Sequence, residues 1–358
     1  MEETPRHKKF LKWVKHHWLT FSFVLGFFSD LILLNQIDSL SDNLMLLFYA
    51  LLATISLLLF YIGIAQRVPA WFGKKFIQFM PTLMQYSFGG LLSGMLIFYG
   101  RSGDWLTSAP FLLIILSVIV GNELVHKRSD RLIYHLALYF IGIFSYIVLV
   151  LPVLFRAMGD LMFFLSGLVA LIIVSLLIQA LHRIVPNFMN ANIRRIILVI
   201  GSIYATLNIL YFTGVLPPIP LSLNKLEIAN LVVSVQGNYQ ISTEAQPWWR
   251  KHPFIPPVLH SNSELSCFAR VYAPTRLSTE IYHRWEYKGS SGKWTDRGRI
   301  KYPIVGSNQG GYRGYTTVGS IQPGMWRCSV ETKRGQVLGR YTVRVDGGSI
   351  ANPVTRTE

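Results

Sequence analysis

Two cysteines are the residues of this sequence with the clearest chemistry. Cys267 lies in "ELSCFARVYA" and Cys328 in "GMWRCSVE", and the chain has no other cysteine. Each alternates in phase with apolar neighbours, as side chains on one face of a β-strand do, so both are expected to face a core. The pair predicts either a disulfide formed in an oxidising compartment or two buried thiols that serve as small apolar side chains.

A histidine and several aromatic side chains form a second group of candidates. His283 and Trp285 share one face of the strand-like stretch "IYHRWEYKGS". On an open surface the histidine would hydrogen-bond a ligand while the aromatic faces stacked on it, as on a sugar ring. The alternative is that Trp285 fills the core of a sandwich and packs on the two cysteines. The candidates for a ligand-binding surface are His283, Trp285, Trp294, Tyr312, Arg313 and Tyr315.

The common catalytic signatures do not occur in the sequence. It contains no H-E-x-x-H, Cys-x-x-Cys, Walker loop, Rossmann glycine fingerprint or G-x-S-x-G elbow. We therefore expect no enzyme activity, no cofactor and no metal centre. The stretch "GGLLSG" at residues 89–94 holds a serine, but Gly90 and Gly94 lie one helical turn apart and are more typical of close packing between helices.

The first two thirds of the chain has the composition of a membrane protein. Apolar residues make up 51% of the sequence, charged residues only 15%, and the mean hydropathy is +0.37. A helix needs about 20 apolar residues to cross a bilayer, so the sequence predicts a seven-helix transmembrane bundle. The expected spans are approximately 18–37, 44–65, 76–99, 105–122, 132–154, 161–181 and 196–216.

Polar side chains inside these spans are candidates for a transport pathway, because they are costly in lipid. Asp30 and Asn208 lie deepest, whereas most of the others fall near span ends, where headgroups or water satisfy them. A small-solute or ion transporter with an accessory soluble domain is therefore the alternative function. The full set comprises Asp30, Glu123, His126, His135, Gln179, His182 and Asn208.

The orientation of the bundle follows from the positive residues, which favour the cytoplasmic side. The first loop, "NQIDSLSDN", has no Lys or Arg, and the third and fifth loops each have one arginine offset by an acid. Seven crossings from a cytoplasmic N-terminus then place everything after residue 216 outside the cytoplasm. The residues that mark cytoplasmic segments are Arg6, Lys8, Lys9, Lys12, Lys15, Arg67, Lys74, Lys75, Lys127, Arg128, Arg131, Arg183, Arg194 and Arg195.

The remainder of the chain predicts a small all-β domain, which makes the whole an α+β membrane protein. A hairpin around Gly237 and Asn238 is expected first, then a proline-rich connector, then an immunoglobulin-like antiparallel β-sandwich. Its strands are expected at 264–273, 279–288, 293–304, 312–318, 325–332 and 336–345. The predicted domains are 1–216 transmembrane, 217–262 hairpin and connector, 263–346 sandwich, and 347–358 a disordered tail.

The last two strands of this domain predict a hairpin with an irregularity. Trp326, Cys328 and Val330 alternate inward on its first strand. On the second strand the apolar phase slips between Leu338 and Tyr341, which requires a bulge near Gly339, because a one-residue shift exchanges the two faces of a strand.

Three stretches of this region together resemble the family called domain of unknown function 2914. They are "IYHRWEYKGS", "GGYRGYT" and "QPGMWRCSVETKRGQVLGRYTVRV", which follow the family's order of an H-x-W strand, an R-x-[WY]-[ST] strand and a P-G-x-W hairpin. Cys328 and Tyr341 depart from the aliphatic residue and the phenylalanine that the family pattern suggests. The resemblance, which extends to "PPIPLSL" and the spans before it, implies a bacterial inner-membrane protein and brings no known activity.

The predicted periplasmic domain is strongly basic, within a chain of 34 Lys and Arg and 18 Asp and Glu. Lys333, Arg334 and Arg340 in the last hairpin are the leading candidates for contact with a partner. An exported domain does not meet nucleic acid, so the expected partners are anionic lipid, anionic envelope polymer or other envelope proteins. The favoured function is an envelope-interaction module held at the bilayer, and the alternative is that the charge only keeps the domain soluble.

Overall fold

The computed structural model divides the chain into two compact units. One comprises residues 1–99 and 109–213, and the other comprises 100–108 and 214–358. Each unit is described by itself. The structure describes residues 21–22, 25, 28–30, 34, 40–67, 74–102, 109–111, 113–114, 117, 128–155, 157–216, 221–248, 255–273, 279–290, 292–304, 311–350 and 352–358.

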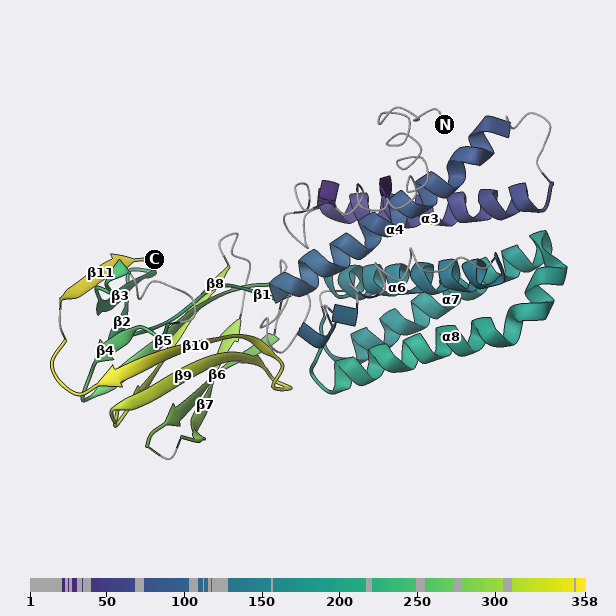
Figure 1. The fold of residues 1–358 in the computed structure, drawn as a ribbon. Helices are drawn as coiled ribbons and strands as arrows, with labels where there is room; N and C mark the ends of the chain where they lie inside the picture. The colour runs from purple at the N-terminus through teal and green to yellow at the C-terminus, as the bar shows by residue number, and fades with distance from the viewer. Residues whose placement is uncertain are drawn as a thin grey trace, which may run out of the picture. The chain divides into compact units, whose positions relative to one another are not determined.

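The first unit is helical (Figure 1). Its long described helices are α3 (Leu40–Ile64), α4 (Lys74–Ser102), α6 (Arg128–Phe155), α7 (Asp160–Ile184) and α8 (Pro186–Phe212). Within the described residues, four segments are long and apolar enough to cross a membrane, and they belong to α3, α6, α7 and α8. These segments are Leu40–Ile64, Leu132–Phe155, Asp160–Ile184 and Pro186–Phe212.

The other predicted membrane spans agree less closely with the described helices or lie largely outside the described residues. Helix α4 covers the expected span 76–99 but is not among the four, because polar side chains such as Gln78, Gln85 and Ser93 lower its hydropathy. The expected spans 18–37 and 105–122 lie largely outside the described residues. Helix α8 begins ten residues before the expected start at 196, so Arg194 and Arg195 are helical residues rather than loop residues.

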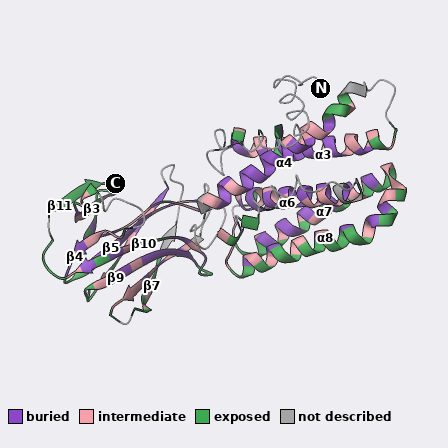
Figure 2. Cartoon of the chain, viewed as in Figure 1, coloured by how far each residue is buried: buried purple, intermediate pink, exposed green. Residues whose placement is uncertain are grey.

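The helices pack closely where small residues face large ones. A side chain at Gly90 would begin 2.6 Å from the ring of Tyr49, and one at Gly94 would begin 2.6 Å from Leu46. The glycine-rich stretch of α4 therefore serves packing against α3. Helix α7 instead has exposed apolar side chains at a spacing of three to four residues, as expected for a face toward lipid. Exposed residues of the helices are green in Figure 2. The side chains of this face of α7 are Leu161, Phe164, Leu168, Ile172 and Leu176.

The second unit contains three small sheets (Figure 1). The first has the order β1 (Ser222–Ala229), β5 (Glu264–Tyr272), β8 (Tyr312–Gly319). The second has the order β4 (Val258–His260), β10 (Val337–Asp346), β9 (Gly324–Thr332), β6 (Thr279–Lys288), β7 (Trp294–Ile304). Neighbouring strands in both sheets are antiparallel, except β4 and β10, which run parallel. The six strands expected between 264 and 345 are confirmed to within two residues at each end.

The third sheet corrects two expectations about the ends of this region. Strands β2 (Leu231–Val235) and β3 (Asn238–Glu244) form the expected hairpin, and β11 (Pro353–Thr357) pairs along β3. Residues 353–357 therefore form a strand within the segment 347–358 that was expected to be a disordered tail. Strand β1 is also not part of a separate juxtamembrane hairpin, because it pairs with β5 of the first sheet over residues 222–229.

The core of the second unit lies between the first two sheets. It contains the buried side chains Ile228, Leu259, Leu265, Cys267, Trp285, Ile321, Trp326, Cys328, Val343 and Val345. The expected bulge in the last hairpin is confirmed, since the pairing of β10 with β9 shifts between Val337 and Gly339. Because of this shift Leu338 and Val343 are both buried on the same strand.

Candidate functional site

The two cysteines join the first two sheets of the β unit. Cys267 of β5 and Cys328 of β9 form a disulfide with their Cα atoms 6.4 Å apart, and both residues are fully buried. Trp285 of β6 belongs to the same cluster and pairs with Cys328 across the strands. The sulfurs and the indole thus occupy the centre of the domain.

His283 lies beside this disulfide and not on an open surface. Its side chain is fully buried on β6, and its Nδ1 is 2.9 Å from Oγ1 of Thr316 on β8. The Nε1 of Trp285 donates to the same hydroxyl at 3.1 Å. Burial lowers the pKa of His283 from 6.5 to about 3, so the imidazole is neutral near pH 7. His283 and Trp285 are therefore core residues, as the alternative of a buried core tryptophan expected, and neither lies on an open surface.

Thr316 is the residue of this cluster that the sequence analysis did not single out. It stands at the end of "GGYRGYT", so the only available signal was its place in a motif. The structure shows why the H-x-W and Tyr-Thr motifs belong together. One threonine hydroxyl serves two polar groups of β6 that have no access to water.

One group of described residues has the geometry to hold a metal. The ligand atoms of Cys267, His283 and Cys328 all lie within 4.8 Å of one another, and all three residues are buried. A cysteine binds a metal as the thiolate, whereas these two sulfurs are bonded to each other. The geometry therefore assigns the cysteines to a structural crosslink between sheets.

The remaining aromatic candidates do not share a surface. Trp294 lies on β7, half-buried beneath the guanidinium of Arg327, whose central carbon is 4.2 Å from the ring centroid. Tyr315 of β8 packs against the small cluster around Phe268. Tyr312 is 9% exposed. Together with the burial of Trp285, these positions exclude a single flat platform for a sugar ring.

The outer face of the second sheet carries most of the charge near these residues. Side chains alternate between faces, so Arg284 and Glu286 of β6 point away from the core that contains Trp285. Pairing across the sheet aligns Arg340 with Ser329, Ser329 with Arg284, and Arg284 with Arg299. Three arginines thus occupy one row.

Carboxylates neutralise much of this row. Arg284 lies 3.0 Å from Asp296, and Arg299 lies 3.5 Å from Glu331. Glu331 is only 5% exposed; burial raises its pKa, while Arg284 and Arg299 act in the opposite direction. The same arrangement recurs nearby in the pairs Arg327 with Glu286 at 2.7 Å, Lys301 with Glu280 at 2.5 Å, and Lys333 with Glu280 at 3.7 Å.

The candidate cations Lys333 and Arg334 are both exposed in the turn between β9 and β10, and Arg340 is exposed on β10. Arg313 lies apart from them, on β8. Its guanidinium donates to the carbonyl of Gly237 at 3.2 Å and lies over the ring of Tyr239. The structure therefore groups three of the four basic candidates on the second sheet.

The intramembrane candidates do not meet in one site. Asp30 is fully buried and accepts hydrogen bonds from the hydroxyls of Tyr49, at 2.8 Å, and Ser93. His135 is buried with Nδ1 3.2 Å from the hydroxyl of Tyr61. Asn208 donates to the carbonyl of Tyr204 on its own helix at 2.8 Å.

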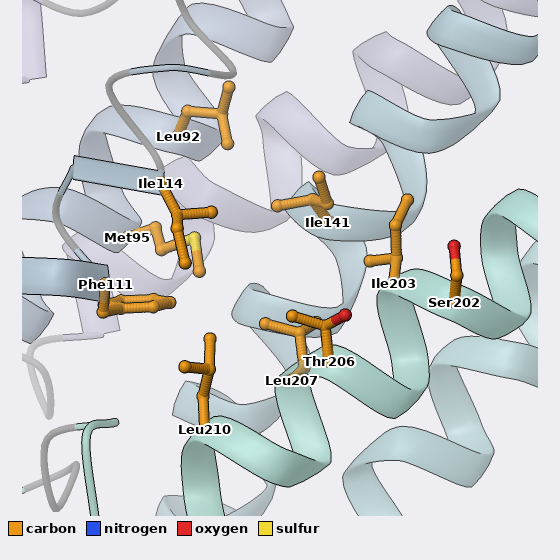
Figure 3. Close-up of a pocket in the computed structure, with 10 residues that line it drawn as sticks. All are labelled: Leu92, Met95, Phe111, Ile114, Ile141, Ser202, Ile203, Thr206, Leu207 and Leu210. Atoms are coloured by element: carbon orange, nitrogen blue, oxygen red, sulfur yellow. The ribbon is translucent and has the colours of Figure 1, made fainter.

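A cavity of about 160 Å³ lies in the helical unit (Figure 3). Its lining is apolar except for the hydroxyls of Ser202 and Thr206, and neither Asp30 nor Asn208 contributes to it. The lining residues are Leu92, Met95, Phe111, Ile114, Ile141, Ser202, Ile203, Thr206, Leu207 and Leu210. This cavity is thus an apolar space and not a polar pathway.

Comparison with known proteins identifies one domain. Residues 278–345 match the family model described as "Protein of unknown function (DUF2914)". This match covers strands β6 to β10 and includes His283, Trp285 and Thr316. No curated protein matches the chain.

Two solved structures share only weak similarity with the chain. A β-glucosidase from Kluyveromyces marxianus is 8% identical with a TM-score of 0.16, and the match covers 37% of this chain and 15% of that one. The alkylpurine DNA glycosylase AlkC from Pseudomonas fluorescens is 10% identical with a TM-score of 0.20, covering 87% of this chain and 99% of that one. Neither similarity carries a functional argument.

Proposed function

We propose that this chain is a bacterial inner-membrane protein that displays a disulfide-bonded β domain in the periplasm, where its basic surface binds anionic groups of the envelope. Seven helices cross the membrane, with the N-terminus in the cytoplasm. The match to an uncharacterised family at residues 278–345 and the four apolar helices fit a membrane protein with a C-terminal domain.

The alternating positive charge supports this orientation. The proposal requires the ends of α3 and α7 to lie on the same, cytoplasmic side. Arg67, which follows α3, donates a hydrogen bond of 2.8 Å to the backbone carbonyl of Arg183 near the end of α7. Two of the positively charged ends assigned to the cytoplasm are therefore in contact.

The crosslink between Cys267 and Cys328 supports an extracytoplasmic β domain, since disulfides persist in oxidising compartments and are rare in the cytosol. The domain itself is proposed to be immunoglobulin-like. Its buried tryptophan on β6 packs on a disulfide between two sheets, as in immunoglobulin domains.

The observation that carries the binding role is the charge balance of the β unit. Residues 214–358 contain 18 Lys and Arg but only 9 Asp and Glu. Several of these acids already pair with basic side chains inside the domain. The β unit therefore has a net surplus of nine positive charges, which favours anionic partners, including anionic lipid, envelope polymer and acidic surfaces of other envelope proteins.

Transport through the bundle is not supported by a specific observation. A transporter would have a polar cavity that joins Asp30 to Asn208. In the part of the chain that the structure describes, the two residues bond to different neighbours and the cavity is apolar. We therefore propose that the bundle acts as an anchor, and no catalytic role is proposed.

The binding role is tested with the full-length chain in nanodiscs of zwitterionic lipid. Phosphatidylglycerol vesicles or dextran sulfate are added as probes over a range of salt. Replacing Lys333, Arg334 and Arg340 together by serine removes three cations, each of which contributes about 1 kcal/mol near an anionic bilayer. We expect roughly a hundredfold weaker binding at low salt and a smaller salt dependence.

The same variant must keep its fold for this result to count, so its thermal unfolding and its disulfide are measured in parallel. Binding equal to that of the parent at every salt concentration would show that the charge only keeps the domain soluble.

A further inference from the structure

The turn between β9 and β10, residues 333–336, is closed by backbone hydrogen bonds. The amide of Thr332 donates to the carbonyl of Gln336, and the amide of Gly335 donates to the carbonyl of Thr332, both at 2.9 Å. Gly335 has φ +83°, a left-handed conformation that glycine adopts without strain. The turn is therefore closed by its own hydrogen bonds.

A neighbouring strand fixes the turn from the side. Arg299 of β7 donates to the carbonyl oxygens of Thr332, at 2.6 Å, and Lys333, at 3.0 Å. The guanidinium of Arg299 also lies over the ring of Tyr282, 4.1 Å from its centroid. These contacts hold the backbone while the side chains of Lys333 and Arg334 remain exposed.

The turn is tethered to the segment that follows the last apolar helix. The side-chain amide of Gln336 donates to the carbonyl of Leu216 at 3.2 Å, and both residues are buried. Leu216 follows Phe212, the last residue of α8, by four positions. Four residues span at most about 15 Å, so the carbonyl that Gln336 contacts belongs to a residue covalently close to the end of α8.

The local charge is positive at this end of the sheet. Arg299, Lys301, Lys333 and Arg334 are exposed cations in the turn or on the strand beside it. The acids near them are Glu280 and Glu331, and Glu331 is buried beneath Arg284 and Arg299. Arginine and lysine both bind phosphate oxygens through charge-assisted hydrogen bonds.

From these contacts we propose that the β9–β10 turn binds the phosphate-bearing headgroups of the same bilayer that the chain's helices cross. This inference rests on the proposed function and narrows it from anionic groups of the envelope to lipid of the chain's own membrane. The cations that contact the headgroups are Lys333 and Arg334, and Gln336 and Arg299 position them.

The sheet offers a matched control for this site. Ile281 pairs with Thr332, whereas Lys288 pairs with Met325 at the other end of β6. Seven residues of strand separate these pairs, or about 24 Å. Replacing Lys288 and Lys293 by serine therefore removes the same charge as replacing Lys333 and Arg334, at a place far from the tether to Leu216.

The experiment uses the full-length chain in two kinds of nanodisc, one of phosphatidylcholine alone and one with phosphatidylglycerol as a third of the lipid. Amide hydrogen exchange is followed in peptides that cover residues 330–340. We expect exchange in the turn to slow several-fold in the anionic nanodiscs. The difference should disappear in the Lys333→Ser, Arg334→Ser variant and persist in the Lys288→Ser, Lys293→Ser control.

Equal exchange in both lipids would overturn this inference, and so would loss of the difference in the control variant. The chain could bind added dextran sulfate or anionic vesicles while hydrogen exchange in the turn stays the same in both kinds of nanodisc. That result would support the proposed function but refute a binding site for the chain's own bilayer. Slower hydrogen exchange in the turn in anionic nanodiscs, with no change when dextran sulfate is added, would support the lipid site.

Discussion

In the cluster of His283, Trp285 and Thr316, buried polar side chains form hydrogen bonds with one another inside the core. An indole N–H and an imidazole nitrogen without access to water both need a partner, because an unmet buried hydrogen bond costs about 1–3 kcal/mol. The hydroxyl of Thr316 accepts from the indole and bonds the imidazole. The three residues thus fix the position of β6 against β8, and we infer a structural role for all of them.

The neutral state of His283 predicts a specific pH dependence. Its pKa is about 3 in the folded domain, against 6.5 without burial, so the unfolded chain takes up the proton first on acidification. Its contribution to stability is complete above pH 6.5 and decreases between pH 6.5 and 3, by up to about 1.4 kcal/mol per pH unit. We expect His283→Gln to reduce this slope in urea unfolding of the full-length chain followed by tryptophan fluorescence.

The control for this prediction is Thr316→Val, which removes the hydroxyl and keeps the imidazole. It should lower the free energy of unfolding but retain the slope. A slope in His283→Gln equal to that of the parent would show that burial does not depress the pKa of His283.

Among the elements, β5 and β9 are joined most directly, because the disulfide links one sheet to the other across the core. The bond closes a loop of 61 residues between Cys267 and Cys328. A crosslink of this length restricts the unfolded chain and, in the loop-entropy account, stabilises the fold by about 4 kcal/mol. This contribution compares with a net stability of about 5–15 kcal/mol for a typical protein.

Replacing Cys267 and Cys328 together by alanine should therefore destabilise the β domain by roughly 2–4 kcal/mol. The measurement is urea unfolding of the parent and the double variant under identical conditions. In the parent, a thiol reagent added after denaturation without reductant should label neither cysteine. Labelling of both residues in exported protein would show that the bond does not form in the cell.

For the molecule as a whole, the proposed orientation makes a further prediction. Because positive residues cluster in alternate loops, alkaline phosphatase fused after Glu358 should be active, and the same enzyme fused near Lys74 should be inactive. A green fluorescent protein fused at the same two positions should show the opposite pattern. Inactive phosphatase at the C-terminus with active phosphatase near Lys74 would place the β domain in the cytoplasm and remove the basis for a periplasmic partner.

The sequence by itself determined the features that depend on local periodicity. The apolar runs predicted helices at α3, α4, α6, α7 and α8, and alternation predicted strands β5 to β10 and the bulge beside Gly339. These signals are carried by residues close together in the chain, so neighbouring residues suffice to detect them.

Tertiary structure alone decided which distant segments meet. It paired β11 with β3, added β1 to the sheet of β5, and brought Thr316 to His283. It also turned outward arginines such as Arg284 and Arg299 toward the buried carboxylate of Glu331. Strand pairing and ion pairs between remote residues depend on how the sheets close around their core, and no local pattern records that arrangement.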